Sequence, residues 1–165
     1  MEKIVAFITA SAVIALSTGA VSAHESSAAG STAAGQTQMA TAQSNLESLP
    51  TVDALPDGVV QVSPVIPGMG AHWANPKDLP LGPIYCVIEG RVTCMEYMIS
   101  QDDFEVGKSF TELRPWFEGA EQPAIDHIEF NFEPNGHEGY EIPHYDVHLY
   151  FVSPEVRKTQ TQAQR

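Results

Sequence analysis

Two segments near the end of the chain alternate strictly between polar and apolar side chains, and this pattern constrains the fold most. In "AIDHIEFNFEP" (residues 124–134), Ile128, Phe130 and Phe132 alternate with polar residues, and "HYDVHLYFV" (residues 144–152) repeats the pattern. A period of two puts successive side chains on opposite faces of a strand. Both segments are therefore predicted to be strands with one polar and one apolar face.

The rest of the domain also favours strands and turns. In "GPIYCVIEGRVTCMEYMIS" (residues 82–100), two strand-like runs flank Glu89-Gly90, which is typical of a hairpin turn. Residues 102–117 contain the one helical candidate, which Ser109 or Thr111 could cap. We predict a mainly β fold, a small antiparallel sandwich or barrel with one short helix and Pro-rich loops.

The N-terminal region is typical of an exported protein. An apolar run over Ile4–Leu16 is too short to span a bilayer, and small residues follow up to Ala23. The next segment is rich in Ser, Ala, Gly, Thr and Gln and cannot bury enough apolar surface to offset its ordering entropy. The predicted organisation is a signal peptide (1–23), a disordered tail (24–46), one β-rich domain (47–156) and a flexible C-terminal tail (157–165).

Charge and export limit the partners that we expect. The net charge of −13 disfavours binding to nucleic acid and to anionic membranes. The chain after Ala23 has no integral membrane segment, so we expect a protein of the periplasm or the extracellular space. Its partners would be a small ligand or a metal ion, and the sequence leaves open whether it forms a homo-oligomer.

The two cysteines allow two arrangements. A two-residue turn at Glu89-Gly90 pairs Cys86 with Thr93 and points Cys94 to the opposite face, whereas a three-residue turn places Cys86 directly across from Cys94. An oxidising compartment favours a disulfide, and the simplest turn disfavours it. Both arrangements stay open; a disulfide here would staple a hairpin and serve a structural role.

His144, Asp146 and His148 share one face of the last predicted strand. On a helix the two histidines would be one turn apart, as in HExxH zinc enzymes, but Tyr145 stands where that motif has Glu. On a straight strand their Cα atoms are ~13 Å apart, so both reach one ion only if the strand bends. The plain alternative is the solvated face of an ordinary strand.

An ordered series of short motifs carries a family resemblance. The series "GMGAHWANP", "LPLGPIYCVIEGRVTCMEYMI", "IDHIEFNFEP" and "GHEGYEIPHYDVHLYF" resembles a family of exported bacterial proteins classed as a domain of unknown function. Its structural prototype is a sigma-E-regulated protein of a thermophile. The resemblance extends from about Val59 to Val152, and the cysteines depart from the family pattern.

The resemblance implies a shared pocket that suits a transition metal, with zinc preferred and copper or iron also compatible. The ligands that it implies are His72, Glu96, His144 and His148. Asp146 would orient a histidine. Further residues expected to line or support the ligand pocket are His137, Trp73, Tyr97 and His127.

Three functional classes follow from these residues. The first is an exported binding protein for a metal or small ligand, with a role in stress response or trafficking. The second is a metal-dependent enzyme in which an open coordination position holds water and Glu96 or Asp146 acts as general base. The third is a structural or assembly protein without metal. The sequence does not decide whether the protein is an enzyme.

Overall fold

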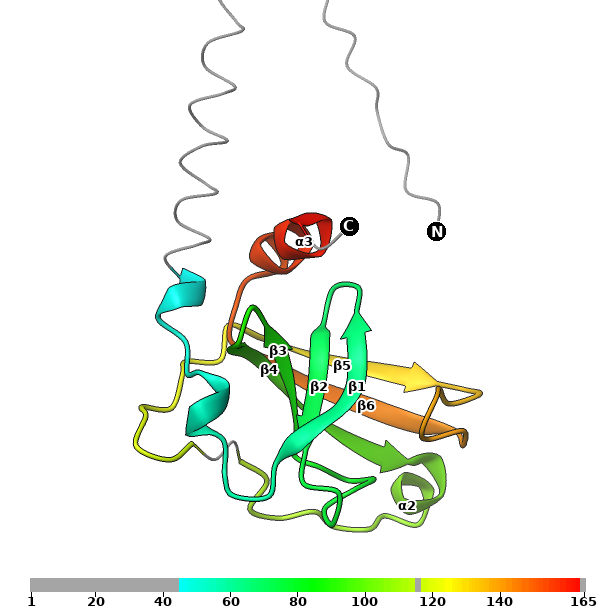
Figure 1. Cartoon of the computed structure of the whole chain (residues 1–165). Coiled ribbons are helices and arrows are strands. Elements are labelled where there is room, and N and C mark those ends of the chain that lie inside the picture. Colours follow the sequence, from blue (N-terminus) through cyan, green and yellow to red (C-terminus); the bar gives the residue numbers. More distant parts are fainter. Residues whose placement is uncertain (1–44, 115–116, 164–165) are drawn as a thin grey trace, which may run out of the picture.

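The computed structural model describes residues 45–114 and 117–163 (Figure 1). The predicted signal peptide and the predicted tail as far as residue 44 lie outside the described residues. None of the described helices is long and apolar enough to cross a membrane.

Six antiparallel strands form one sheet, which confirms the mainly β fold. The sheet order is β1-β2-β3-β4-β6-β5, so β1 and β5 are its edges. A single open sheet replaces the expected sandwich or closed barrel. The strands are β1 (Val60–Ile66), β2 (Gly70–Ala74), β3 (Ile84–Ile88), β4 (Arg91–Ser100), β5 (His127–Glu133) and β6 (His144–Tyr150).

The sheet has one apolar and one polar face. Directly paired residues of antiparallel strands point to the same side, and the pairs Trp73↔Tyr85 and Tyr85↔Met95 belong to the apolar side. That side is the main core, where Leu46, Val92 and Phe151 are also buried. The polar side carries the alternate residues of the same strands. It faces the β1–β2 hairpin, which lies over β5 and β6 (Figure 1).

The helices differ from the expected single helix in residues 102–117. Helix α2 (Gln101–Glu105) begins directly after β4 and is capped by Ser100, whose side chain accepts a hydrogen bond from Asp103 N at 3.1 Å. Neither Ser109 nor Thr111 caps a helix, because α2 ends before them. The structure also contains a 3-10 helix, η1 (Val52–Ala54), and a longer helix, α3 (Pro154–Ala163).

The domain extends beyond both expected boundaries. Leu46, expected in the tail from its sequence context, is 1% exposed and packs in the core. At the other end, Val156 is buried within α3, and Arg157 makes side-chain hydrogen bonds to Glu129. The expected flexible tail from residue 157 is instead helical as far as Ala163. It continues a helix that Val156 anchors to the core.

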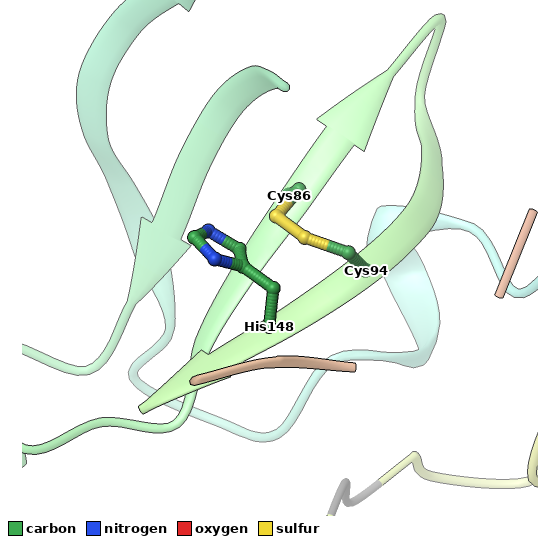
Figure 2. Close-up of side chains that lie close together, drawn as sticks. All are labelled: Cys86, Cys94 and His148. Carbon is green, nitrogen blue, oxygen red and sulfur yellow. A yellow bond between two sulfur atoms is a disulfide. The ribbon is translucent and has the colours of Figure 1, made fainter. Parts of the chain in front are cut away.

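The β3–β4 hairpin combines both arrangements considered for the cysteines. Its turn has two residues, since Ile88 pairs with Arg91, and yet Cys86 pairs with Cys94. A register shift reconciles the two, because Thr93 is an extra residue, a β-bulge, between the pairs. Cys86 and Cys94 form a disulfide on the polar side of the sheet, beside His148 (Figure 2).

Candidate metal centre

The polar face of the sheet collects most of the residues singled out from the sequence. The pairs Ser100↔His144, Met98↔Asp146 and Glu96↔His148 place the three stripe residues of β6 on this face. The buried charged or polar side chains of the described residues are Thr93, Glu96, His144, Asp146 and His148. The stripe is thus not a solvated strand face, because the β1–β2 hairpin and the β5–β6 loop cover it.

His144 is the most enclosed of these residues. Its side chain is fully buried, and its Nδ1 lies 2.7 Å from Ile142 O. Its Nε2 lies 3.2 Å from His137 Nε2 and 3.0 Å from Asp146 Oδ1. His137 Nε2 lies 3.8 Å from Asp146 Oδ2. Two imidazoles and one carboxylate therefore converge on one point.

The backbone contacts fix the tautomers of both histidines. A carbonyl oxygen can only accept, so Nδ1 of His144 carries the proton and donates it to Ile142 O. His137 Nδ1 lies 3.2 Å from Glu138 O, which assigns its proton in the same way. In the neutral rings, both Nε2 atoms then present lone pairs to each other and to Asp146. A cation between these atoms satisfies all three, and metal-bound histidines usually make this type of Nδ1–H contact.

The spacing of the three ligands suits a tetrahedral ion. With bonds of about 2.0–2.1 Å to nitrogen and oxygen, neighbouring ligand atoms of a tetrahedral zinc site are roughly 3.3 Å apart. The observed separations of 3.0, 3.2 and 3.8 Å bracket this value, with the carboxylate using a different oxygen toward each ring. Small rotations of the three side chains would equalise them. Histidine and carboxylate ligands of this kind also bind copper and iron.

The β5–β6 loop brings His137 to the strand. Backbone hydrogen bonds run in both directions between His137 and Tyr140, which closes the loop tightly. Gly136 adopts a positive φ of +64°, and a Cβ there would lie 2.2 Å from Tyr140 O. Only glycine fits this position, so the loop that carries His137 depends on it. The His137 side chain is 42% exposed, which gives an ion a route to the buried His144.

Glu96, His72 and His148 form the adjoining part of the polar face. Burial raises the pKa of Glu96 to about 8, with further contributions from the charge of Asp146 and a hydrogen bond to it. Burial, together with the charge of His137, lowers the pKa of His72 to about 4. Burial also lowers the pKa of His148 to about 4. At neutral pH the metal-free pocket therefore holds a protonated carboxyl and two neutral imidazoles.

A cavity of about 470 Å³ opens onto this cluster. His72, Glu96, His137 and Asp146 contribute its polar wall, and Val62, Ile66 and Met69 of the β1–β2 hairpin contribute the apolar one. The Nε2 atom of His72 is buried and has no hydrogen-bond partner in the described structure. A buried polar atom without a partner costs free energy, so this atom is available to a ligand in the cavity.

The geometry of β6 separates the four ligands expected from the sequence, which are His72, Glu96, His144 and His148. The strand pairs in continuous register with β4 and does not bend to bring His144 and His148 together. Among the described residues, two groups of three His, Cys, Asp or Glu side chains have ligand atoms that all lie within 4.8 Å of one another: His137 with His144 and Asp146, and Cys86 with Cys94 and His148. His137 and Asp146, expected in supporting roles, thus belong to the first group.

The remaining candidates lie farther from this point. Tyr97 and Trp73 pack on the core side of the sheet, so they do not line the pocket; the Tyr97 hydroxyl donates to Arg114 O at 3.2 Å. His127 lies on β5, with Nδ1 2.8 Å from Asp126 Oδ1 and its ring stacked on Tyr150.

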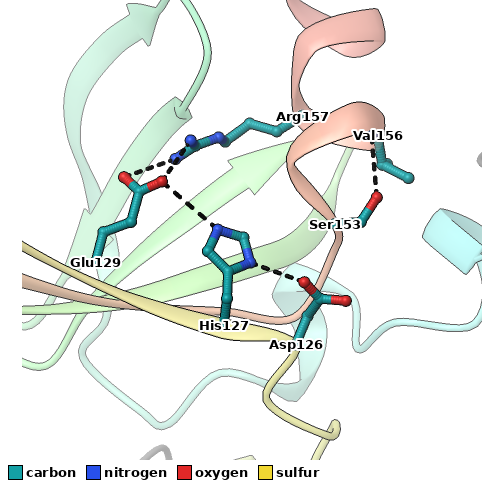
Figure 3. Close-up of polar contacts among 6 residues, drawn as sticks. All are labelled: Asp126, His127, Glu129, Ser153, Val156 and Arg157. Carbon is teal, nitrogen blue, oxygen red and sulfur yellow. Dashed lines mark hydrogen bonds and ion pairs between the residues drawn. The ribbon is translucent and has the colours of Figure 1, made fainter. Parts of the chain in front are cut away.

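An ion pair between Arg157 and Glu129, near His127, is not expected from the sequence. Arg157 of α3 contacts both carboxylate oxygens of Glu129 on β5, at 2.7 and 3.2 Å (Figure 3). The Arg157 guanidinium also lies over the Tyr150 ring. The hydrogen bond from Arg157 lowers the pKa of Glu129. The alternation marks Glu129 as a member of the polar face, but no local signal pairs it with a residue of the expected C-terminal tail.

Comparison with known proteins supports the fold. No family model matches the sequence, and no curated protein is significantly similar to it. The crystal structure of a hypothetical protein from Thermus thermophilus is similar with a TM-score of 0.50 and 21% sequence identity. The match covers 66% of this chain and 98% of the other. At this identity the similarity extends to the fold alone.

Proposed function

We propose that this protein is an exported binding protein for a transition metal ion, and that His137, His144 and Asp146 hold the ion. The observation that carries the proposal is the convergence of two Nε2 atoms, 3.2 Å apart, on a buried carboxylate. The ligand types and the spacing favour zinc. Export and a role in stress response or trafficking rest on the sequence and on the family resemblance.

The cavity gives the same site a second candidate function. Three protein ligands leave a fourth position open, and water bound there would be activated by the ion. The protonated Glu96 is hydrogen-bonded to Asp146 beside the cavity and would exchange a proton with a substrate. A metal-dependent enzyme is therefore the alternative, and a bound small molecule in the 470 Å³ cavity would be its substrate.

Elemental analysis and zinc titration test the proposal. The untagged protein is purified without chelator, its metal content is measured, and zinc binding is followed by calorimetry. We expect one ion per chain, and the His144→Ala and His137→Ala variants should each lower zinc affinity by at least about tenfold, since even the loss of a contact to a metal ligand costs about 10- to 100-fold. His127→Ala, which removes an imidazole outside the group, is the matched control and should bind zinc as the parent does.

Two results would overturn the proposal. Zinc affinity unchanged in both His144→Ala and His137→Ala would place any bound ion elsewhere. A parent protein without metal, which also fails to bind added zinc or copper, would leave a structural or assembly role as the better account. Hydrolytic turnover by the zinc-loaded protein that disappears in Glu96→Gln would favour the enzyme.

A further inference from the structure

A second group of metal-ligating residues lies on the same face, outside the site described above. It consists of the two cysteines of the β3–β4 hairpin and His148 of β6. One ligand atom from each lies within 4.8 Å of the others. Figure 2 shows the imidazole of His148 beside the disulfide that joins Cys86 to Cys94.

The imidazole of His148 stacks on the Tyr150 ring, but its nitrogens have no hydrogen-bond partner among the described residues. Its side chain is 6% exposed, and neither Nδ1 nor Nε2 has a hydrogen-bond partner in the described structure. The nearest carboxylate oxygen, Glu96 Oε1, lies 3.7 Å from Nε2, beyond hydrogen-bond distance. Burying an imidazole with both nitrogens unpaired costs free energy. In the oxidised protein the disulfide sulfurs, which are weak acceptors, are its neighbours.

Reduction changes the chemistry of these neighbours. A small dithiol gives up two electrons and two protons, the Sγ–Sγ bond breaks, and Cys86 and Cys94 become thiols while the dithiol becomes a cyclic disulfide. A divalent ion can then displace both thiol protons to solvent and bind the two thiolates and one nitrogen of His148. Two thiolates and an imidazole are the ligands that zinc and other soft or borderline ions prefer.

We infer that Cys86, Cys94 and His148 form a second metal site, which exists only when the disulfide is reduced. The geometry of the hairpin supports this inference. The Thr93 bulge keeps the two cysteines directly paired, with Cα atoms 4.9 Å apart and both side chains on the face of His148. His72, paired with Cys86 on β2, and Glu96, two residues after Cys94, stand beside the group and can complete its coordination.

The oxidised state excludes the ion, because a disulfide sulfur lacks the negative charge that makes a thiolate a ligand. The second site therefore cannot bind a metal ion while the disulfide is formed and can bind one when both cysteines are reduced. The His137, His144 and Asp146 site contains no sulfur, so its ion does not depend on the cysteines. Loss of metal binding at one site should therefore leave metal binding at the other site unchanged.

Cobalt titration under anaerobic conditions tests the inference. The full chain is expressed in reducing cells and purified with a phosphine reductant, and its two thiols are counted by alkylation and mass spectrometry. We expect cobalt to produce a near-ultraviolet sulfur-to-cobalt absorption band in the reduced protein and none in the oxidised protein. His148→Ala should weaken cobalt binding at this band by at least about tenfold, since even outer-shell losses cost about 10- to 100-fold.

Two variants separate this site from the first one. The double substitution Cys86→Ser and Cys94→Ser should abolish the band, while His144→Ala should retain it. A folded, reduced protein without the band overturns the inference, and so does a band that survives unchanged in His148→Ala. Circular dichroism monitors the fold; a band that forms only in unfolded reduced chain also overturns it.

Discussion

Glu96 and His148 are directly paired residues of β4 and β6, with Glu96 Oε1 3.7 Å from His148 Nε2 on the polar face of the sheet. Burial acts on them in opposite directions, raising the pKa of the carboxyl to about 8 and lowering that of the imidazole to about 4. Each group is thereby held neutral at pH 7. The metal-free pocket therefore avoids buried charge at this pH, and its stability depends on pH wherever the folded and unfolded chains hold different numbers of protons at these groups.

The stability of the metal-free protein should consequently fall between pH 6.5 and 8. In this range folded Glu96 holds a proton that the unfolded chain, in which the carboxyl has its ordinary pKa of 4.5, has lost. Stability from a raised pKa is fully present below 4.5 and is lost as the pH rises through about 8. The slope should approach about 1.4 kcal/mol per pH unit.

Urea denaturation at closely spaced pH values, with chelator present, measures this decline. Glu96→Gln keeps the shape and the hydrogen-bonding capacity of the side chain and removes the titration. The variant should therefore show a flatter profile above pH 6.5. An equally steep decline in Glu96→Gln would assign the pH dependence to another group.

Zinc should stabilise the protein against unfolding, because the unfolded chain does not hold His137, His144 and Asp146 together. At a free zinc concentration 100 times the dissociation constant, the gain should be about 2.7 kcal/mol. Chelator should return the stability to that of the metal-free protein. Thermal unfolding of the parent and of His144→Ala, with and without zinc, measures the effect; an equal zinc gain in the variant would count against the site.

Gly70→Ala should destabilise the fold by roughly 3 kcal/mol, combining left-handed backbone strain with overpacking. Gly70 has a φ of +81°, and a Cβ there would lie 2.1 Å from Val87 O, so β2 could no longer approach β3. Gly107→Ala is the matched control, because Gly107 has a φ of +69° and no atom within 4 Å of the added Cβ.

The control should lose only about 1 kcal/mol, the strain of a left-handed residue. Chemical denaturation of both variants isolates the cost of the close approach. Equal losses in the two variants would show that β2 and β3 tolerate the added methyl group.

Arg157→Ala should destabilise the protein by about 1 kcal/mol, the upper range for partly exposed ion pairs. The substitution removes two hydrogen bonds to Glu129 and the stacking on Tyr150. Because Arg157 holds the pKa of Glu129 below 4.5, this contribution is present above pH 4.5 and is lost as the pH falls through the lowered pKa. Denaturation of Arg157→Ala and of the exposed control Lys158→Ala, at two pH values, checks both the loss and its pH dependence.

Much of the sheet could be predicted because its strands carry their own periodicity. The alternation at residues 127–132 and 144–151 places His144, Asp146 and His148 on one face, and the β5–β6 pairing brings Glu129 directly opposite His148. Local patterns of two-residue period suffice for this, since pairing preserves the face of each side chain.

The composition of the candidate site required information that local patterns lack. His137 reaches His144 through a loop closed by hydrogen bonds between its own backbone atoms. A straight β6 is predicted to separate His144 from His148, and the continuous register does separate them into different groups. Helix α3 has the composition of a tail because its residues are mostly polar, whereas Val156 and Arg157 attach it through tertiary contacts.

The Thr93 bulge has a consequence for the length of the hairpin. Cys86 and Cys94 are eight positions apart, so seven residues separate them, an odd number. A two-residue turn with matched arms always encloses an even number, and the unmatched residue restores the parity that the cysteines need to meet. Removing Thr93, or adding one residue to the opposite arm, would make the two arms equal in length, and the cysteines would then pair across a regular ladder without a bulge.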